Sequence, residues 1–209
     1  MQATTRLEHM FAPSAERFVV SKSTAPDSIV LGIDPGLTRC GYAVLEVRGF
    51  TDISLVAIGV LRTSADDNLP DRLAELSIEI EELLDEYRPT VVAVEHIFFQ
   101  SNVRTAMSVG QVSGLALSAA SRRGCQVVQY TPNQVKMAIT GWGSADKAQV
   151  QRMVKQRLGL STIPKPADAA DAAAIALCHV ASYPLAHKIA QNIALNKTAA
   201  VREKKSHSG

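Results

Sequence analysis

Cysteine is scarce in this sequence, and its spacing excludes two common architectures. The three cysteines are Cys40, Cys125 and Cys178, and no two of them form a CxxC pair. An odd number of widely separated thiols argues against a disulfide framework and against a thiolate zinc site. The sequence therefore predicts a protein of a reducing compartment, and we expect it to be cytoplasmic.

Long apolar runs and a secretory signal are also missing. No apolar run approaches the roughly 18 residues that a membrane-spanning helix needs. The N-terminal residues lack the apolar segment of a signal peptide. With 46% hydrophobic and 20% charged residues, the 209-residue chain has the composition of one globular domain. We expect no membrane association.

Charge of either sign is unevenly distributed, although the formal net charge is only +2. Residues 64–87 contain nine acids and one arginine, whereas residues 122–165 contain eight basic residues and a single acid, Asp146. Residues 184–209 add five Lys or Arg against Glu203. An acidic face and a basic face suit a protein that binds a polyanion. Judged by charge alone, a slightly better explanation is that these side chains only keep the helices soluble.

Apolar, β-branched runs predict five strands in an α/β arrangement. Short links join the first three strands, which favours an antiparallel meander. A crossover helix separates the first strand from the fourth, which favours a parallel pair lying side by side. The expected strands are residues 28–34, 41–47, 52–62, 90–95 and 125–130.

Periodicity and capping signals predict the helices between these strands. Leucines and isoleucines of residues 69–87 recur at helical spacing with the acids outside. Thr131, followed by proline, is typical of a helix N-cap. The spacing of Gly110 and Gly114 permits close helix packing, although ordinary core packing is the commoner reason for it. The expected helices are residues 69–87, 103–123, 132–140, about 145–158 and 167–182.

The stretch IVLGIDPGLTRCG, residues 29–41, ends a buried strand with an acid at a tight turn. Proline presets φ and glycine accepts a positive φ, so Pro35-Gly36 fits such a turn. Asp34 is therefore expected at the rim of the sheet. Taken alone, the pattern is explained equally well by an ordinary turn whose acid is solvated.

Three further acids are expected near Asp34. Glu95 ends the fourth strand, which lies beside the first, so the two acids are neighbours by topology. Asp168 and Asp171 share one face at the start of the last helix. Acids there also complement the helix dipole, which is an alternative reason for their presence. The body of that helix is too apolar to face solvent, so its acids point to the sheet edge or to water.

Four carboxylates at one edge would repel each other, and a divalent cation would relieve that repulsion. Oxygen ligands without a nearby thiolate favour Mg²⁺ or Mn²⁺ over zinc. Two such ions can activate a water molecule and stabilise the leaving oxygen of a phosphoryl displacement. The acids therefore predict phosphodiester hydrolysis, provided that they converge.

Five segments in order, LGIDPG, VAVEHIFFQSN, YTPNQVK, GSADKAQV and PADAADAAAIALCH, closely resemble motifs of the RuvC family of Holliday-junction resolvases. The resemblance covers about residues 28–182. It implies an RNase H-like fold, a five-stranded mixed sheet of order 3-2-1-4-5 flanked by helices. We expect a flexible leader at 1–27, this nuclease domain at 28–183 and a basic tail at 184–209.

The resemblance also implies an activity and its partners. Members of the family are homodimers that resolve four-way DNA junctions by paired symmetric nicks, using Mg²⁺, in recombination and repair. It implies two Mg²⁺ ions per subunit, replaceable by Mn²⁺, and RuvA–RuvB as the partner complex. The catalytic, metal-binding acids that it implies are Asp34, Glu95, Asp168 and Asp171.

The resemblance implies three further functional residues, Phe98, Lys136 and Lys147. Phe98, in a loop after the fourth strand, could wedge between bases, with a core anchor as the alternative. Lys136 and Lys147 could neutralise phosphate, with solvated side chains as the alternative. Asn102 and Arg104, which the resemblance does not assign, are weaker candidates for phosphate contacts. His96 is expected to face away from the acids, and His179 to make a structural hydrogen bond.

Two other functions remain possible from the sequence. An actin-like or sugar-kinase ATPase also carries an Asp-x-Gly-x-Thr pattern after its first strand, which Asp34, Gly36 and Thr38 satisfy. That fold needs two domains, and the chain has no Walker A sequence. A non-catalytic junction-binding module is the second alternative, although it has no use for four acids that repel phosphate.

Overall fold

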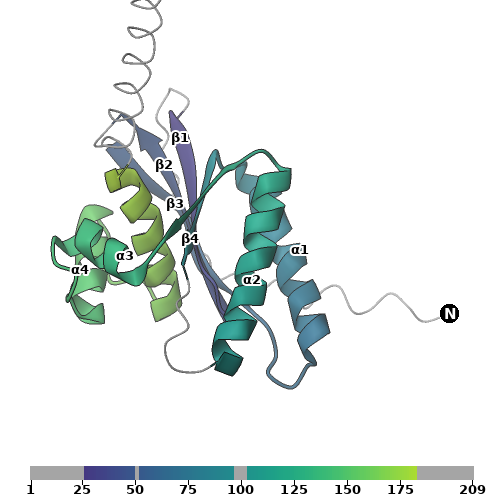
Figure 1. Ribbon diagram of the computed structural model, residues 1–209. Coiled ribbons are helices and arrows are strands. Elements are labelled where there is room, and N and C mark those ends of the chain that lie inside the picture. The colour runs from purple at the N-terminus through teal and green to yellow at the C-terminus, as the bar shows by residue number, and fades with distance from the viewer. Residues whose placement is uncertain (1–25, 50–51, 97–102, 183–209) are drawn as a thin grey trace, which may run out of the picture.

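The computed structural model describes residues 26–49, 52–96 and 103–182, with side chains in the last range from residue 106. These residues form three layers around one sheet (Figure 1). The expected leader, except for its last two residues, and the expected tail lie outside the described residues. Within the described ranges, no helix is long and apolar enough to cross a membrane.

The central sheet has five strands in the order β3-β2-β1-β4-β5. β2 pairs antiparallel with β1 and β3, whereas β4 pairs parallel with β1 and β5. The expected mixed sheet and its strand order are therefore confirmed. β2 is longer than expected because its ladder with β3 continues to the Arg39–Arg62 pair. The strands are β1 Ser28–Asp34, β2 Arg39–Arg48, β3 Asp52–Arg62, β4 Val91–Glu95 and β5 Gln126–Tyr130.

The helices begin and end at the capping residues that the sequence carries. Thr131 and Gln134 form a capping box at the start of α3, as do Asp146 and Gln149 at the start of α4. Because Asp146 is the N-cap, α4 starts later than expected. The helices are α1 Leu69–Tyr87, α2 Val103–Arg122, α3 Pro132–Thr140 and α4 Lys147–Arg157. Residues 167–182 form a further helix, here called the 167–182 helix.

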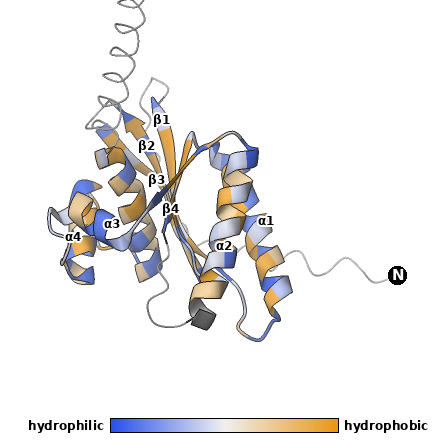
Figure 2. Ribbon diagram, viewed as in Figure 1, coloured by the Kyte–Doolittle hydropathy of each residue, from blue (hydrophilic) through white to orange (hydrophobic). Residues whose placement is uncertain are grey.

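Helices cover both faces of the sheet, so its strands are apolar on both sides. α1 and α2 pack on one face, and α3, α4 and the 167–182 helix lie on the other (Figure 1). Alternate residues of β1 enter different cores: Val30 packs with the 167–182 helix, and Leu31 packs with α1 and α2. Apolar residues accordingly line the interior of all three layers (Figure 2).

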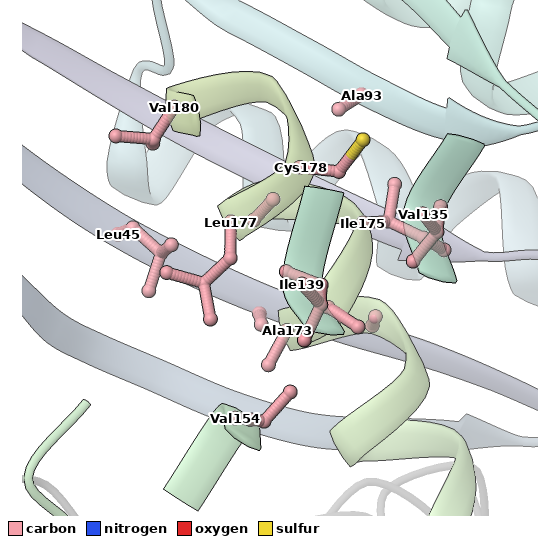
Figure 3. Close-up of a cluster of buried hydrophobic side chains, with 14 of the residues drawn as sticks. Leu45, Ala93, Val135, Ile139, Val154, Ala173, Ile175, Leu177, Cys178 and Val180 are labelled. Carbon is pink, nitrogen blue, oxygen red and sulfur yellow. The ribbon is translucent and has the colours of Figure 1, made fainter. Parts of the chain in front are cut away.

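The 167–182 helix is the most deeply buried helix in the described part of the chain. Residues 169–180 are buried, with the exception of Asp171. Its alanines let the helix lie close to the sheet, since a Cβ at Gly32 would collide with the backbone carbonyl of Ala172. Figure 3 shows Ile175, Leu177 and Cys178 of this helix among side chains from the sheet, α3 and α4.

The two glycines of α2 do not take part in core packing, the commoner reason for their spacing. Gly110 and Gly114 are exposed, and a Cβ added at either would meet no atom within 4 Å. They therefore belong to the outer face of the helix, together with Met107, which is 59% exposed. Within the described residues, this face has neither a close helix neighbour nor a core role.

Candidate active site

Asp34 and Glu95 are brought together by the parallel pairing of β1 and β4. The ladder pairs Ile33 with Val94, so each acid is the next residue on its strand. Both acids end their strands at the same edge of the sheet, as the sequence predicted. A hydrogen bond from Asp34 acts to lower the pKa of Glu95, which requires the two carboxyl groups to be in contact.

The third acid is positioned by the contact between β2 and the 167–182 helix. Gly41 of β2 is paired with Asp34. A side chain at Gly41 would collide with the backbone carbonyl of Asp168, so only glycine allows the helix to begin this close to the strand. Asp168 is thereby fixed at the rim next to Asp34, and Asp171 follows one turn later.

The electrostatics of the rim show that the four acids interact. Burial is the largest cause that raises the pKa of Asp34, from 3.8 to about 7, and the charges of Glu95, Asp171 and Asp168 raise it further. The pKa of Glu95 is also raised, first by burial and then by Asp171. Loss of water and repulsion between carboxylates thus bring the titration of Asp34 into the neutral pH range.

Two cations pair with the acids of the 167–182 helix. The ammonium of Lys147 donates to Asp171 Oδ2 at 2.5 Å, and this hydrogen bond raises the pKa of the lysine. Arg39 Nε lies 3.3 Å from Asp168 Oδ2. The side chains of Lys147 and Arg39 are 59% and 55% exposed, so both pairs lie at the solvent side of the rim.

The donor chemistry of this rim fits a hard divalent cation, but the side chains do not form a closed ligand set. Among the residues that the structure describes, no three acidic, histidine or cysteine side chains lie close enough to hold one ion as they stand. Asp168 and Asp171 are turned toward Arg39 and Lys147 instead. The role of the four acids as metal ligands stays a prediction, and it requires these two ion pairs to open.

The sequence argument did not identify two arginines that shape the rim. Arg39 could have been noticed, since it follows Asp34 by five residues and starts the neighbouring strand. Arg72 of α1 donates from Nε to Thr63 Oγ1 at 2.9 Å and from Nη2 to Thr38 Oγ1 at 2.7 Å. These hydrogen bonds connect the turn after Asp34 to the end of β3 and to α1. No local sequence pattern predicts them, because they join separate segments of the chain.

The residues expected to bind DNA are only partly described. Lys147 lies at the rim, as given above, and Lys136 lies on α3 with a half-buried side chain. Lys136 makes no ion pair with the four acids in the part of the chain that is described. Phe98 and Asn102 lie outside the described residues, so their roles stay predictions.

Two histidines can be compared with their expected roles. His179 is buried and its Nδ1 lies 2.9 Å from Tyr130 Oη, which confirms the structural hydrogen bond expected for it. Burial lowers the pKa of this histidine. His96 is exposed, and its backbone N–H donates to the carbonyl of Tyr130 at 2.8 Å.

Comparison with known proteins agrees with this architecture. The family model described as crossover junction endodeoxyribonuclease RuvC matches residues 30–179. The chain belongs to the RuvC family. A RuvC protein of Leifsonia xyli is 56% identical over 150 residues, which cover 72% of each chain. A RuvC protein of Streptomyces griseus is 49% identical over 170 residues, or 81% of this chain and 83% of that protein.

A solved member of the RuvC family has the same fold. The structure of Thermus thermophilus RuvC in complex with a Holliday junction substrate is 38% identical in sequence and has a TM-score of 0.72. The match covers 76% of this chain and 96% of that one. The RNase H-like fold expected from the resemblance is therefore confirmed.

Proposed function

We propose that this protein is a structure-specific endonuclease of the cytoplasm that resolves four-way (Holliday) DNA junctions by paired symmetric nicks. The observation that carries the proposal is the convergence of four acids at one rim of the sheet: Asp34, Glu95, Asp168 and Asp171. Membership of the RuvC family and the likeness to a relative solved with a Holliday junction support it. The biological setting that we infer is homologous recombination and DNA repair.

The chemistry requires a divalent metal, and we assign the four acids as its ligands. We infer two Mg²⁺ ions per subunit, which Mn²⁺ could replace, because all the donors are oxygen atoms. When bound, Mg²⁺ supplies the charge that activates water and stabilises the leaving oxygen in phosphodiester hydrolysis. Asp34, with its pKa raised to about 7, has to release its proton before it can act as a ligand at neutral pH.

Basic residues at the rim complete the proposed site. Lys147 holds its ammonium next to Asp171 and can turn to a phosphate oxygen when DNA is bound. Lys136 on α3 is the second proposed phosphate contact. We retain Asn102 as a further polar contact and Phe98 as the wedge that holds the junction centre open.

Paired cuts need two active sites, and a symmetric homodimer supplies them. We infer that the outer face of α2 forms the dimer interface. Gly110 and Gly114 leave room there for another helix, and Met107 adds an exposed apolar side chain. RuvA–RuvB, the branch-migration complex implied by the family, is the partner that we propose for the dimer.

Neither alternative function accounts for the rim as well. An ATPase of the actin-like type needs a second domain to close over nucleotide, and the described residues contain a single sheet. A non-catalytic junction-binding module gains nothing from four acids that repel phosphate. Both remain open to direct measurement in the same assay.

The test is a cleavage assay on a synthetic four-way junction with Mg²⁺, in which both labelled strands are followed and ATP turnover is measured in parallel. We expect paired nicks at symmetric positions, products with 5′-phosphate and 3′-hydroxyl ends, and no ATP turnover. A linear duplex of the same sequence is the control substrate. ATP hydrolysis without nicking, or junction binding without nicking, would reject the proposal.

The Asp34→Asn variant connects this assay to the site. Cleavage should fall about 10²- to 10³-fold or more, the usual cost of losing one stabilising group in an active site. Junction affinity should persist, because the substitution removes a negative charge that repels phosphate. Retention of wild-type nicking by Asp34→Asn would show that the assigned acids are not the catalytic centre.

A further inference from the structure

Trp142, in the turn between α3 and α4, and Met137, on α3, are two exposed large apolar residues. Their exposed fractions are 59% and 50%. The turn that carries Trp142 lies against the end of α3 that carries Met137, because a Cβ at Gly143 would lie 3.4 Å from Met137 Cγ and Gly141 N–H donates to Met137 O at 2.9 Å. Exposed aromatic side chains beside a second large apolar residue are typical of an interaction surface.

The turn that carries Trp142 is held in one backbone conformation. The hydroxyl of Thr140 lies 3.0 Å from Trp142 O and accepts from Trp142 N–H at 3.1 Å. Ala145 N–H donates to the same carbonyl at 3.1 Å. Gly141, in the left-handed conformation, caps the C-terminal end of α3, and a capping box closes the N-terminal end of α4. The indole is therefore presented to solvent by an ordered backbone, and that backbone loses little conformational freedom when a partner binds.

The charges around this turn favour a polyanion. α3 carries Lys136 on one side, and α4 begins on the other with Lys147, the residue that reaches the acidic rim. The one acid between them, Asp146, is engaged at Oδ1 by the backbone N–H of Gln149 at 2.7 Å. Lys or Arg recurs farther along α4 at Arg152, Lys155 and Arg157.

We propose that Trp142, supported by Met137, contacts a DNA arm of the junction beside the cleavage site. The indole would pack against a sugar or a base while Lys136 and Lys147 meet the flanking phosphates. The turn between α3 and α4 thus extends the nucleic-acid surface away from the four acids. This inference rests on the proposed junction-resolving function and names part of its substrate surface.

The chain contains one tryptophan, so its intrinsic fluorescence reports on this site alone. The full-length protein is titrated with a synthetic four-way junction in a metal-chelating buffer that prevents cleavage. Acrylamide quenching of the indole is then measured with and without saturating DNA. We expect the quenching constant to fall about twofold or more on binding, as stacking covers the ring.

Variants measure how much the contact contributes. Trp142→Ala should weaken junction affinity about 5- to 10-fold, the lower part of the range for a base–aromatic contact, and Trp142→Phe should recover most of it. The control is Ile78→Ala on α1, where an apolar side chain that is 60% exposed lies on the opposite face of the sheet. That control should bind the junction as the wild type does.

Each outcome decides the inference. An electrophoretic mobility shift assay shows independently whether the junction is bound. If it is bound while acrylamide still quenches the indole equally well, the contact does not exist. Unchanged affinity of Trp142→Ala would lead to the same conclusion. Indole protection that depends on protein concentration without DNA would assign the turn to contact between copies of the chain and overturn the proposal. A protein that binds and cuts no junction at all would reject the proposed function itself, which Trp142→Ala alone cannot do.

Discussion

At the scale of single residues, the acids of this protein fall into two groups with different environments. Asp34 and Glu95 are enclosed at strand ends, where burial raises the pKa of each. Asp168 and Asp171 are 21% and 26% exposed and pair with cations. An ion that binds the site would have to compete with the proton of Asp34, whose pKa is about 7, and displace the cations of the second group.

Arg39 is expected to compete with metal for Asp168. Arg39→Ala should strengthen the binding of Mg²⁺ or Mn²⁺ to the DNA-free protein by up to about fivefold, because an exposed ion pair contributes at most about 1 kcal/mol. Isothermal titration with either ion measures the change. Arg48→Ala is the control, since Arg48 pairs with Glu46 at 2.7 Å at the other end of β2. Weaker metal binding by Arg39→Ala would show that the arginine supports the site instead of competing.

Outside the site, Glu79 is a partly buried acid that lowers stability when it is charged. Its Oε2 is buried without a hydrogen-bond partner, and burial together with Glu75 and Glu82 raises its pKa from 4.5 to about 7. The pKa of Glu79 is about 7 in the folded protein and 4.5 in an exposed glutamate, so the unfolded chain releases this proton at a lower pH. The stability that is fully present below pH 4.5 is therefore lost as the pH rises to about 7. The charged form therefore destabilises the fold at neutral and alkaline pH.

Glu79→Gln should stabilise the protein above pH 7 and have little effect at pH 4. The full shift is discounted because the side chain is only partly buried, which leaves about 1–2 kcal/mol in the free energy of unfolding. Urea unfolding of both proteins across this pH range measures the difference. A gain that is the same at pH 4 and pH 8 would contradict the assigned cause.

At the scale of elements, the site depends on how close the 167–182 helix lies to the sheet. The glycines at positions 32 and 41 permit that approach, since a side chain at either would collide with backbone of the helix. On the side of the sheet that faces α1, hydrogen bonds from Arg72 to Thr38 and Thr63 fix the turn after Asp34. Packing of backbone on backbone thus sets the relative positions of the acids.

Gly41→Ala should displace Asp168 from the rim. We expect a loss of about 1–3 kcal/mol in stability, because the carbonyl that meets the new methyl group cannot turn aside. Cleavage of folded protein should fall by about 10²-fold, the cost of a misplacement near 1 Å. Denaturant unfolding and the junction assay measure the two effects.

Gly59→Ala on β3 is the matched control for this substitution. Its methyl group would meet the ring of Tyr42, a side chain that can rotate, and it lies away from the helix. Stability should fall while cleavage stays close to the wild-type rate. Equal losses of cleavage in the two variants would mean that the Gly41 contact does not position the acid.

At the scale of the whole molecule, charge is divided between the two faces of the sheet. The acidic helix α1 lies on one side, and the basic α3 and α4 lie on the other, beside the rim (Figure 1). A polyanion is therefore attracted to the face that holds Lys136 and Lys147 and repelled from the α1 face. Among the residues that the structure describes, no element covers the outer surface of α2, which is the surface that we propose for a second copy of the chain.

Gly114→Leu should convert the proposed dimer to a monomer. The described residues leave open space around a Cβ at Gly114, so the fold should tolerate the new side chain while close approach of another helix is blocked. Light scattering should show half the mass, and the junction should receive uncoupled nicks. Ala74→Leu, on the exposed side of α1, is the control. A dimeric Gly114→Leu would place the interface elsewhere.

Several features of this protein were determined by the sequence alone. Runs of β-branched residues, helical periodicity and the caps at Thr131 and Asp146 depend on interactions between near neighbours, so they can be recognised locally. The crossover helix between the first and fourth strands implied that they pair in parallel, which made Asp34 and Glu95 neighbours. The resemblance to family motifs identified the other two acids, Asp168 and Asp171. The residues alone left open whether these acids face the sheet edge or only complement the helix dipole.

Only the tertiary structure decided how the rim is assembled. The contact of Gly41 with Asp168, and the pairing of Lys147 with Asp171, join residues far apart in the chain. Such contacts depend on the close packing of whole elements, which no local pattern encodes. The same packing left Trp142 exposed and turned Gly114 to the outside, because burial of a side chain is settled only when every layer is in place.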